Sequence, residues 1–255
     1  MSVTAVTGSA SGIGAAVCEK LRAAGHTVIG IDRHQAEVNA DLSSPEGRAN
    51  AAEQVIKLAN GKLDGLVCCA GLGVTAPSSS LVVSVNYFGS TELIELLQPA
   101  LAKGEQPAIT VIGSVAASQQ VADPHPIIEL MLNNDEPAAR ALADELGQPQ
   151  IAYSASKYAL TVHCRRLAVK TGSTGVRINL VAPGAIETPL HEASKQDPRF
   201  GEAVRNFVAP IGRNGQPSEI ADAVSFLQSA QASFVHGSII YVDGGMDAMM
   251  RNGKF

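Results

Sequence analysis

Short apolar runs alternate with segments of helical periodicity along the whole chain. "VTAVT" (3–7) and "TVIGID" (27–32) are rich in β-branched residues, which is typical of strands. Between them, apolar residues recur at helical spacing over 13–21, and Gly25 stands where the end of a helix is expected. The start of the chain therefore predicts a strand, a helix and a second strand.

The same alternation continues to the end of the chain. Further strands are predicted in a short segment ending at Asp41 and at 64–71, 108–114, 176–184 and 238–245, with helices at 45–60, 86–101, around 153 and at 217–229. Strands separated by helices predict parallel pairing, and near-continuous apolar strands predict a sheet covered on both faces. The pattern predicts an α/β fold with a doubly wound parallel sheet of the Rossmann type, in one domain over residues 1–255.

Residues 116–150 interrupt this alternation, because only a short connection is expected between a strand and the next helix. The stretches "PIIELML" and "DEPAARALADELG" predict two short helices. In the second, Asp135 is expected as the N-cap, Pro137 lies in the first turn and Gly147 ends the helix. We interpret the segment as a helical insertion within the domain.

Composition narrows the function classes. The 255 residues are 45% hydrophobic and 17% charged, as in a globular protein with a large core. A net charge of −5, 4% aromatic residues and the lack of a long basic run argue against nucleic-acid binding. Nothing reads as a signal peptide or a membrane span. The four cysteines do not look like a disulfide framework, so we expect a cytoplasmic protein. Neither the cysteines nor the six histidines have metal-ligand spacing, so we expect no metal site.

A glycine-rich turn, "TGSASGIG" (7–14), follows the first predicted strand and opens the first helix. Its glycines allow a tight turn close to a pyrophosphate, and the helix N-terminus offers N–H groups to the anion. Asp32 ends the next strand, 18 residues after Gly14, where a carboxylate can bind ribose hydroxyls and repel a 2′-phosphate. This favours NAD over NADP, although Arg33 could pair with such a phosphate, and Asp32 could instead be a simple turn residue.

A tyrosine and a lysine share one face of a predicted helix in "YSASKYAL" (153–160). Tyr153 precedes Lys157 by four residues, so their side chains project together. That spacing is common, and by itself it also fits an incidental pair on an amphipathic helix.

Taken together, the motifs resemble the short-chain dehydrogenase/reductase family over nearly the whole chain. The resemblance rests on the Thr-Gly-x-x-x-Gly-x-Gly turn, Asn86, Ser114, Tyr153 with Lys157, and "PGAIETP" (183–189). Two features depart from the usual family pattern: "CCAG" (68–71) replaces Asn-Asn-Ala-Gly, and the insertion precedes the tyrosine helix. Both departures resemble a bacterial subgroup that oxidises 3α-hydroxysteroids and reduces other carbonyl compounds.

The resemblance implies a catalytic set of Ser114, Tyr153, Lys157 and Asn86. Tyr153 would be the general acid/base, with a pKa lowered by Lys157 and by the cationic oxidised nicotinamide. Ser114 would bind the substrate oxygen, and Lys157 would also hold the nicotinamide ribose. Asn86 would anchor a water-linked proton path to Lys157, although it could equally be a structural helix residue.

The resemblance also implies a set of cofactor-binding residues. They are Gly8, Ser11, Gly12, Ile13, Gly14, Asp32, Asp41, Leu42, Ala70, Gly71, Tyr153, Lys157 and Thr188. Asp41 and Leu42 would lie beside the adenine, and Thr188 would contact the phosphate or carboxamide end. Cys68 and Cys69 could suggest redox chemistry, but buried strand cysteines are usually inert.

Residues 188–212 carry spaced apolar side chains among polar neighbours. These are Leu190, Phe200, Phe207, Val208 and Ile211. They could form an ordinary pair of surface helices, but the family folds its substrate lid here, and a steroid or another hydrophobic carbonyl compound would suit such a lid.

The sequence therefore predicts an NAD-dependent enzyme that reversibly oxidises 3α-hydroxysteroids and also reduces other ketones and aldehydes. One alternative is the same chemistry on a non-steroid alcohol, and another is a non-catalytic dinucleotide sensor. The presence of Ser114, Tyr153 and Lys157 favours an enzyme. Members of the family often associate through the helix that carries Tyr153, and the insertion directly precedes this helix and would block the usual packing. We therefore expect a homodimer that forms differently, with the insertion contributing to the contact.

Overall fold

The structure is a computed structural model that describes residues 2–119 and 125–253, so residues 120–124 of the predicted insertion lie outside the described residues. Within the described part, one sheet of seven parallel strands has the order β3-β2-β1-β4-β5-β6-β7. The strands are β1 (Val3–Thr7), β2 (Thr27–Asp32), β3 (Val38–Asn39), β4 (Gly65–Cys68), β5 (Ala108–Ile112), β6 (Arg177–Pro183) and β7 (Ile239–Val242).

Helices connect the strands and cover the sheet. They are α1 (Gly12–Ala23), α2 (Pro45–Leu58), α3 (Ser79–Val83), α4 (Gly89–Leu101), α5 (Pro126–Leu132), α6 (Glu136–Leu146), α7 (Pro149–Thr171), α8 (Pro189–Lys195), α9 (Gly201–Asn206), α10 (Pro217–Gln228) and α11 (Met246–Met250). Shorter helical turns are η1 (Ser84–Phe88), η2 (Val115–Gln119), η3 (Gly172–Thr174) and η4 (Ala230–Ala232).

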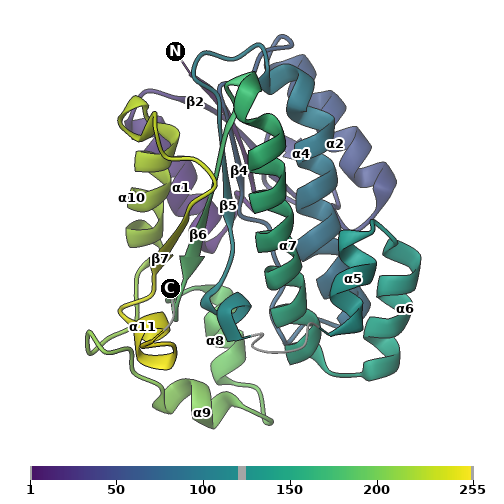
Figure 1. Ribbon diagram of the computed structural model, residues 1–255, viewed down its shortest axis with the longest axis vertical. Helices are drawn as coiled ribbons and strands as arrows, with labels where there is room; N and C mark the ends of the chain where they lie inside the picture. The colour runs from purple at the N-terminus through teal and green to yellow at the C-terminus, as the bar shows by residue number, and fades with distance from the viewer. Residues whose placement is uncertain (1, 120–124, 254–255) are drawn as a thin grey trace.

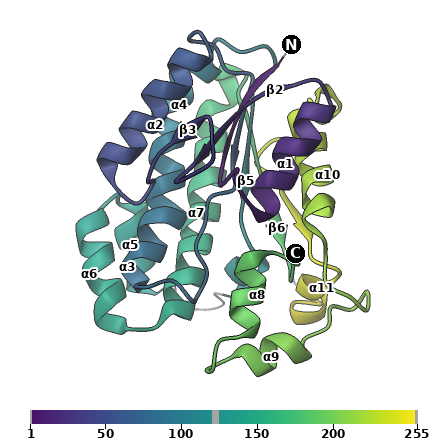
Figure 2. The same ribbon diagram turned by 180° about the vertical axis from the view of Figure 1, so that it is seen from behind.

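Both faces of the sheet are buried, which explains why its strands are almost continuously apolar. In Figures 1 and 2, α1 and α10 lie on one face, and α2, α4 and α7 lie on the other. Neighbouring strand residues point to opposite faces, so Ala5 and Leu66 enter one core cluster while Val6 and Val67 enter the other. The predicted doubly wound fold is confirmed.

The carboxyl ends of the strands meet at one edge of the sheet, at the bottom of Figure 1, beside α8, α9 and α11. From β1 the chain builds outward to β2 and β3 on one side, and β4 pairs with β1 on the other side. Such a switch point opens a crevice at the carboxyl edge, which is where parallel α/β sheets bind their ligands.

The predicted insertion forms α5 and α6, which pack against α7 and α3 beside the main body (Figure 1). The Asp135 carboxylate accepts a hydrogen bond from the Ala138 N–H at 3.1 Å, and Gly147 ends α6 with a φ of +58°. The predicted N-cap and terminal glycine of this helix are therefore confirmed.

The helix predicted at 86–101 begins seven residues earlier, so that prediction is wrong at its start. Ser78 caps α3 by accepting from the Leu81 N–H at 3.2 Å, and the chain continues through η1 into α4. The turn η1 is a π-helix, a rare conformation that often occurs at functional sites. Asn86 lies in the middle of this turn instead of at the start of a helix.

The third strand is also shorter than predicted and ends at Asn39 instead of Asp41. Asp41 instead begins a turn, because its carboxylate accepts a hydrogen bond from the Ser43 N–H at 2.9 Å.

Candidate active site

A cavity of about 1120 Å³ opens at the carboxyl edge of the sheet. It is bounded by the glycine-rich turn, by the ends of β2, β4, β5 and β6, and by α8 and α9. All thirteen residues predicted to bind the cofactor line it, and so does Ser114. Asn86 does not line the cavity. The structure thus brings the predicted residues together, while their individual roles remain predictions.

The glycine-rich turn leaves no room for side chains at two positions. A Cβ on Gly8, which has a φ of +66°, would lie 2.9 Å from Ala70 Cα, and a Cβ on Gly14 would overlap the Gly8 carbonyl oxygen. Ser11 begins α1 with an extended backbone and makes no side-chain cap. The first N–H groups of α1 are thus not taken up by a cap, and this cradle fits a pyrophosphate.

Asp32 connects the end of β2 to the tip of the glycine-rich turn. Its carboxylate accepts hydrogen bonds from the Ala10 N–H at 3.0 Å and the Arg33 N–H at 2.7 Å. Arg33 also lines the cavity. A carboxylate held in this way has further lone pairs for ribose hydroxyls, so the residues present fit a dinucleotide.

Tyr153, Lys157 and Ser114 converge around the end of β5. The Tyr153 and Ser114 side chains both line the cavity, and the Ser114 side chain is near enough to favour the ionised form of Tyr153. The Ser114 Oγ accepts from the Ala116 N–H at 3.1 Å. Lys157 Nζ donates to the Ile112 carbonyl oxygen at 2.9 Å, at the last residue of the strand. The carboxyl end of β5 therefore positions both members of the Tyr–Lys pair.

Burial dominates the proton affinities in this cluster. It lowers the pKa of Lys157 to about 8, because the ammonium group loses its hydration. In the chain by itself, burial raises the pKa of Tyr153, and the Ser114 side chain opposes this only in part. The predicted lowering of the Tyr153 pKa depends on the oxidised nicotinamide as well as on Lys157, so it stays a prediction.

Asn86 lies behind the cavity wall and is fully buried. Its Oδ1 accepts from the Leu72 N–H at 2.7 Å, and its Nδ2 donates to the Leu72 carbonyl at 3.0 Å and to Ser156 Oγ at 3.3 Å. A Cβ on Gly71 would lie 3.4 Å from Asn86 Oδ1 and 3.6 Å from Lys157 Nζ. Asn86 therefore holds the loop after β4 close to the lysine, as the structural alternative requires, and the water-linked path stays a prediction.

Cys68 ends β4, and Cys69 follows it directly. Burial raises the pKa of Cys68 to about 12, and it raises that of Cys69, which lines the cavity, well above its usual range. A protonated thiol is a poor nucleophile, and that the two cysteines are inert stays a prediction. The four cysteines of the chain are all free, and the described residues contain no cluster suited to a metal ion.

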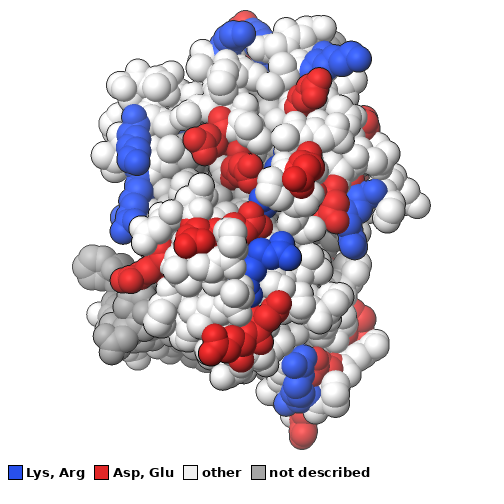
Figure 3. Space-filling model, turned by 90° about the vertical axis from the view of Figure 1, so that its right-hand side faces the viewer, with Lys and Arg blue, Asp and Glu red and all other residues white. Residues whose placement is uncertain are grey.

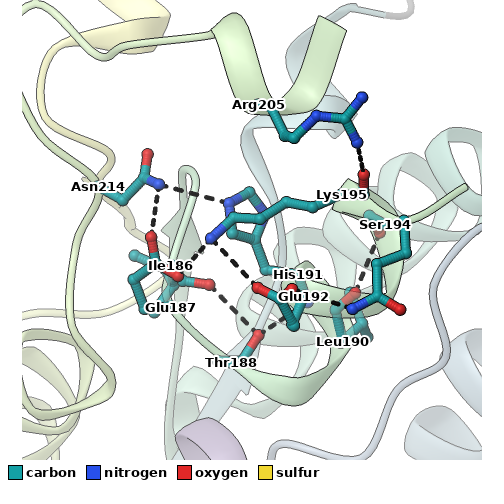
Figure 4. A network of polar contacts seen from close by, with 11 residues as sticks. Ile186, Glu187, Thr188, Leu190, His191, Glu192, Ser194, Lys195, Arg205 and Asn214 are labelled. Carbon is teal, nitrogen blue, oxygen red and sulfur yellow. Dashed lines mark hydrogen bonds and ion pairs between the residues drawn. The ribbon is translucent and has the colours of Figure 1, made fainter. Parts of the chain in front are cut away.

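A polar network holds the base of α8 (Figure 4). Glu187 accepts from Lys195 Nζ and from Asn214 Nδ2, each at 2.7 Å. Thr188 caps α8 by accepting from the His191 N–H at 3.2 Å. The opposite cavity wall is near, since a Cβ on Gly12 would lie 3.5 Å from Thr188 Cγ2. Thr188 is thereby fixed directly beside Gly12 of the glycine-rich turn.

The apolar lining of the lid is narrower than predicted. Leu190, Phe200 and Phe207 line the cavity, whereas Val208 and Ile211 are 57% and 63% exposed and do not. The chain leaves the cavity after Phe207, so the last two residues of the predicted apolar set lie outside it.

Several residues of the site went unrecognised in the sequence. The carbonyl oxygen of Ile112 has no sequence signal, because any residue type supplies one. His191, Gln150 and Met246 line the cavity but belong to no motif. Ser156 could have been suspected, because a hydroxyl three residues after Tyr153 on a helix can reach its carbonyl oxygen.

Comparison with known proteins gives consistent matches. Residues 2–124 match the family model described as short chain dehydrogenase, and residues 139–247 match the model described as Enoyl-(Acyl carrier protein) reductase. The chain is 49% identical over 257 residues to a 3-alpha-hydroxysteroid dehydrogenase/carbonyl reductase of Comamonas testosteroni, covering 100% of both. It is 34% identical over 248 residues to a galactitol 2-dehydrogenase (L-tagatose-forming) of Cereibacter sphaeroides, covering 94% of this chain and 93% of that one.

Among solved structures, the 3-alpha-hydroxysteroid dehydrogenase from Pseudomonas sp. B-0831 complexed with NADH superposes with a TM-score of 0.98. The two sequences are 57% identical, and the match covers 100% of both chains. Levodione reductase superposes with a TM-score of 0.76 at 26% identity, covering 97% of this chain and 98% of that one.

Proposed function

Because this chain belongs to the short-chain dehydrogenase/reductase family, we propose that it is an NAD(H)-dependent 3α-hydroxysteroid dehydrogenase that also reduces other ketones and aldehydes. The observation that carries the proposal is that Ser114, Tyr153 and Lys157 line one cavity together with apolar side chains of the lid. Two proteins named 3-alpha-hydroxysteroid dehydrogenase match the chain over its full length, at 49% and 57% identity, and this supports a hydroxysteroid as the substrate.

NAD(H) is the cofactor we assign. The Pseudomonas relative was crystallised with NADH, and the glycine cradle and the carboxylate of Asp32 support the same cofactor here. When bound, the nicotinamide supplies or accepts the hydride at the substrate carbon. Asp32 would repel the 2′-phosphate of NADP, and Arg33 is the residue that limits how strict this preference is.

The residues of the chain then handle the proton and the oxygen. The raised pKa keeps Tyr153 protonated near neutral pH, so its hydroxyl is ready to donate to the carbonyl oxygen during reduction. Ser114 holds the same oxygen and stabilises the charge that develops there. Lys157 uses one N–H for Ile112, which leaves two for the ribose hydroxyls.

The cavity has space for a second, hydrophobic ligand. Its volume of about 1120 Å³ exceeds the roughly 300–1,000 Å³ of single-ligand pockets. Leu190, Phe200 and Phe207 supply apolar surface on the lid side. A flat steroid would bury such surface, whereas a sugar alcohol would leave its hydroxyl groups unpaired against it.

Replacement of Tyr153 by Phe tests the acid/base assignment. Tyr153→Phe should lower turnover of a 3-ketosteroid by about 10²–10⁴-fold while NADH binding stays nearly intact. Binding can be followed by NADH fluorescence without tryptophan interference, since the chain has no tryptophan. A variant that retains the wild-type rate would refute the role of Tyr153.

A panel of ketones at saturating NADH tests the substrate class. Reduction of 3-ketosteroids supports the proposal, and failure on every 3-ketosteroid with turnover of another ketone would favour a non-steroid alcohol dehydrogenase. NADH binding without turnover of any compound would instead favour a dinucleotide sensor.

A homodimer is part of the proposal. Strand β7 is an edge strand of the sheet. Tyr241 on this strand is partly exposed, and Phe234, just before it in the chain, is fully exposed. Exposed edge strands and apolar side chains favour association with a second copy of the chain. The insertion side, shown in Figure 3, carries acidic side chains across its middle. Glu46, Glu92, Glu95 and Glu136 lie near one another, and Arg48 neutralises only part of their charge, so two copies of this region would repel each other. The β7 edge is therefore the better-supported contact.

Light scattering of two variants separates these dimer contacts. Phe234→Glu should give a monomer if the β7 edge forms the interface, whereas Ala141→Arg, on the exposed side of α6, should leave the dimer intact. The reverse result would support the predicted role of the insertion.

A cytoplasmic location is also proposed, because the free cysteines suit a reducing compartment. No helix in the described residues is long and apolar enough to cross a membrane.

A further inference from the structure

We propose that Ser156 is a positioning residue that couples the loop after β4 to the catalytic turn of α7. This inference rests on the proposed function, because it assigns Ser156 a task for the cofactor and for Tyr153. Ser156 lies between Tyr153 and Lys157 in the sequence, is fully buried and does not line the cavity. It therefore acts on the site only through its neighbours.

The Ser156 hydroxyl bridges two elements of the fold. Its Oγ donates to the Tyr153 carbonyl oxygen at 2.7 Å and accepts from Asn86 Nδ2 at 3.3 Å. A hydroxyl has a single proton, and the Tyr153 carbonyl can only accept, so that proton is committed to it. The Asn86 amide must then turn its NH₂ group toward Ser156, which fixes the orientation of the amide.

The fixed amide in turn holds the loop after β4. The side-chain amide of Asn86 accepts from the Leu72 N–H at 2.7 Å and donates to the Leu72 carbonyl at 3.0 Å. It thus satisfies both backbone groups of Leu72, as a neighbouring strand does in a β-sheet. Leu72 follows Gly71, which lines the cavity and leaves only a narrow space beside Lys157 Nζ. The connection thus runs from the Tyr153 turn through Ser156 and Asn86 to the cavity wall.

Local helix chemistry alone does not explain this arrangement. Hydroxyl-to-carbonyl bonds within α7 also occur at Thr171, whose Oγ1 donates to the Leu167 carbonyl at 3.0 Å. Thr171 is buried as well, but it lies at the far end of the helix and none of its hydrogen bonds reaches the cavity. Ser156 differs because it also accepts from a fully buried amide on another helix. Without that acceptor the amide loses a partner where water cannot replace it.

Comparison of Ser156→Ala with Thr171→Ala tests the proposal. Both variants lose a buried hydroxyl and its bond to a carbonyl of α7, so they share the purely structural loss. In Ser156→Ala, we expect NADH affinity to fall about fivefold to tenfold, measured by NADH fluorescence without substrate. We expect the kcat–pH profile of 3-ketosteroid reduction to shift as well, while Thr171→Ala keeps NADH affinity and pH profile within about twofold of wild type.

A double-mutant cycle checks that Ser156 acts through Asn86. In Asn86→Ala, the added change Ser156→Ala should weaken NADH binding by less than twofold, because the shared connection is already broken. Full additivity of the two losses would overturn the proposed coupling. If Ser156→Ala does not fold, Ser156→Cys keeps the side-chain volume with a much weaker hydrogen bond and provides the same comparison.

Ser156→Ala behaving like Thr171→Ala in both NADH affinity and pH profile would overturn the positioning role. Because NADH affinity is measured without substrate, the test is separate from the steroid assignment. A wild-type protein that binds NADH but turns over no 3-ketosteroid would refute the proposed substrate and leave the Ser156 comparison decisive.

Discussion

The insertion and the lid are both pairs of short helices added to the same sheet, yet they are held in opposite ways. In the insertion, Ile127, Ile128 and Met131 of α5 and Ala139 and Ala143 of α6 are all buried in the main core cluster. In the lid, the described parts of α8 and α9 bury only Ser194 and Gly201. The insertion is therefore part of the hydrophobic core, whereas the lid rests on the surface of the cavity.

The charged contacts also differ between the two regions: the arginine that pairs with the insertion is buried, whereas the arginine of the lid is exposed to solvent. Arg48 of α2 is 0% exposed and bridges Glu136 of the insertion and Glu92 of α4, at 2.5 Å each. In the lid, Arg199 pairs with Asp197 and its guanidinium is half-exposed. A buried ion pair depends strongly on both partners, whereas an exposed pair can exchange its contacts with water.

The difference assigns the two additions different tasks. Arg140 of α6 donates to Ser84 Oγ at 3.0 Å, in the π-helical turn that carries Asn86, so the insertion supports the rear of the site. The lid, with few buried contacts, belongs to the least stable part of the fold and can open for ligand exchange. The insertion thus packs behind the site, whereas the lid lines its cavity.

The largest effect is expected from removal of the buried arginine. Arg48→Met leaves the carboxylates of Glu92 and Glu136 without their partner, which should lower the free energy of unfolding by about 3–5 kcal/mol. Urea denaturation measures this. Lys62→Met, which breaks the exposed pair with Glu105, is the matched control and should leave the midpoint unchanged. An unchanged midpoint for Arg48→Met would show that the buried pair does not hold the insertion.

A matched pair of apolar truncations should separate the two regions next. Met131→Ala empties a fully buried site in the insertion and should cost about 2–4 kcal/mol of unfolding free energy. Val208→Ala, after the lid helices, removes a largely exposed side chain and should cost less than about 0.5 kcal/mol. Equal costs in urea denaturation would contradict the distinction between core and surface.

A smaller effect is expected where the lid meets the loop after β4. A Cβ on Gly73 would lie 2.9 Å from Leu190 Cδ2, so Gly73→Ala should push the Leu190 side chain aside at the cavity wall and raise KM for NADH about twofold to fivefold. The unfolding midpoint should not change, because the lid can shift without exposing core. Gly253→Ala, which meets nothing within 4 Å, is the control for steady-state kinetics. A lower midpoint without a change in KM would mean that this contact is structural.

The smallest effect is a dependence of the lid on pH through His191. Burial lowers the pKa of His191 and Lys195 adds to this, while Glu187 and Glu192 oppose it. When the lid packs on the cavity, His191 therefore binds a proton less readily than when the lid is exposed to water. The contribution of His191 to lid packing is complete above about pH 6.5, the ordinary pKa of histidine, and is lost progressively as the pH falls below that value.

Limited proteolysis of the lid, relative to His191→Gln at each pH, checks this effect. The wild-type lid should be cleaved a few-fold faster relative to the variant at pH 5.5 than at pH 7.5. An equal ratio at both pH values would remove His191 as the cause. Cleavage in α5 or α6 should show no such change.

Much of the fold could be predicted from the sequence because local signals and tertiary structure agree there. The apolar runs became strands, and Asp135 and Gly147 became the caps that their residue types favour. The start of the helix before Asn86 could not be predicted in this way. The Ser80 N–H at its start donates to Asp144 of the insertion at 2.8 Å, and this contact comes from a distant part of the chain.

The sequence indicated which residues come together around the cavity, whereas the burial and contacts of their side chains are visible only in the structure. The spacing of Tyr153 and Lys157 and the glycine pattern are visible in the sequence, because each depends on local geometry. The raised pKa of Tyr153 and the interaction of Lys157 with the carbonyl of Ile112 depend on burial and on a neighbouring strand. Neither quantity can be read from residue types.

The sequence by itself determined the alternation of strands and helices, the glycine-rich turn and the spacing of Tyr153 and Lys157, since these depend on residues near one another in the chain. Only the tertiary structure decided which of the two added helix pairs is rigid, how Ser156 connects Asn86 to Tyr153, and how far burial shifts each proton affinity. Those properties arise where distant segments exclude water together, and hydration is lost only once the chain has folded.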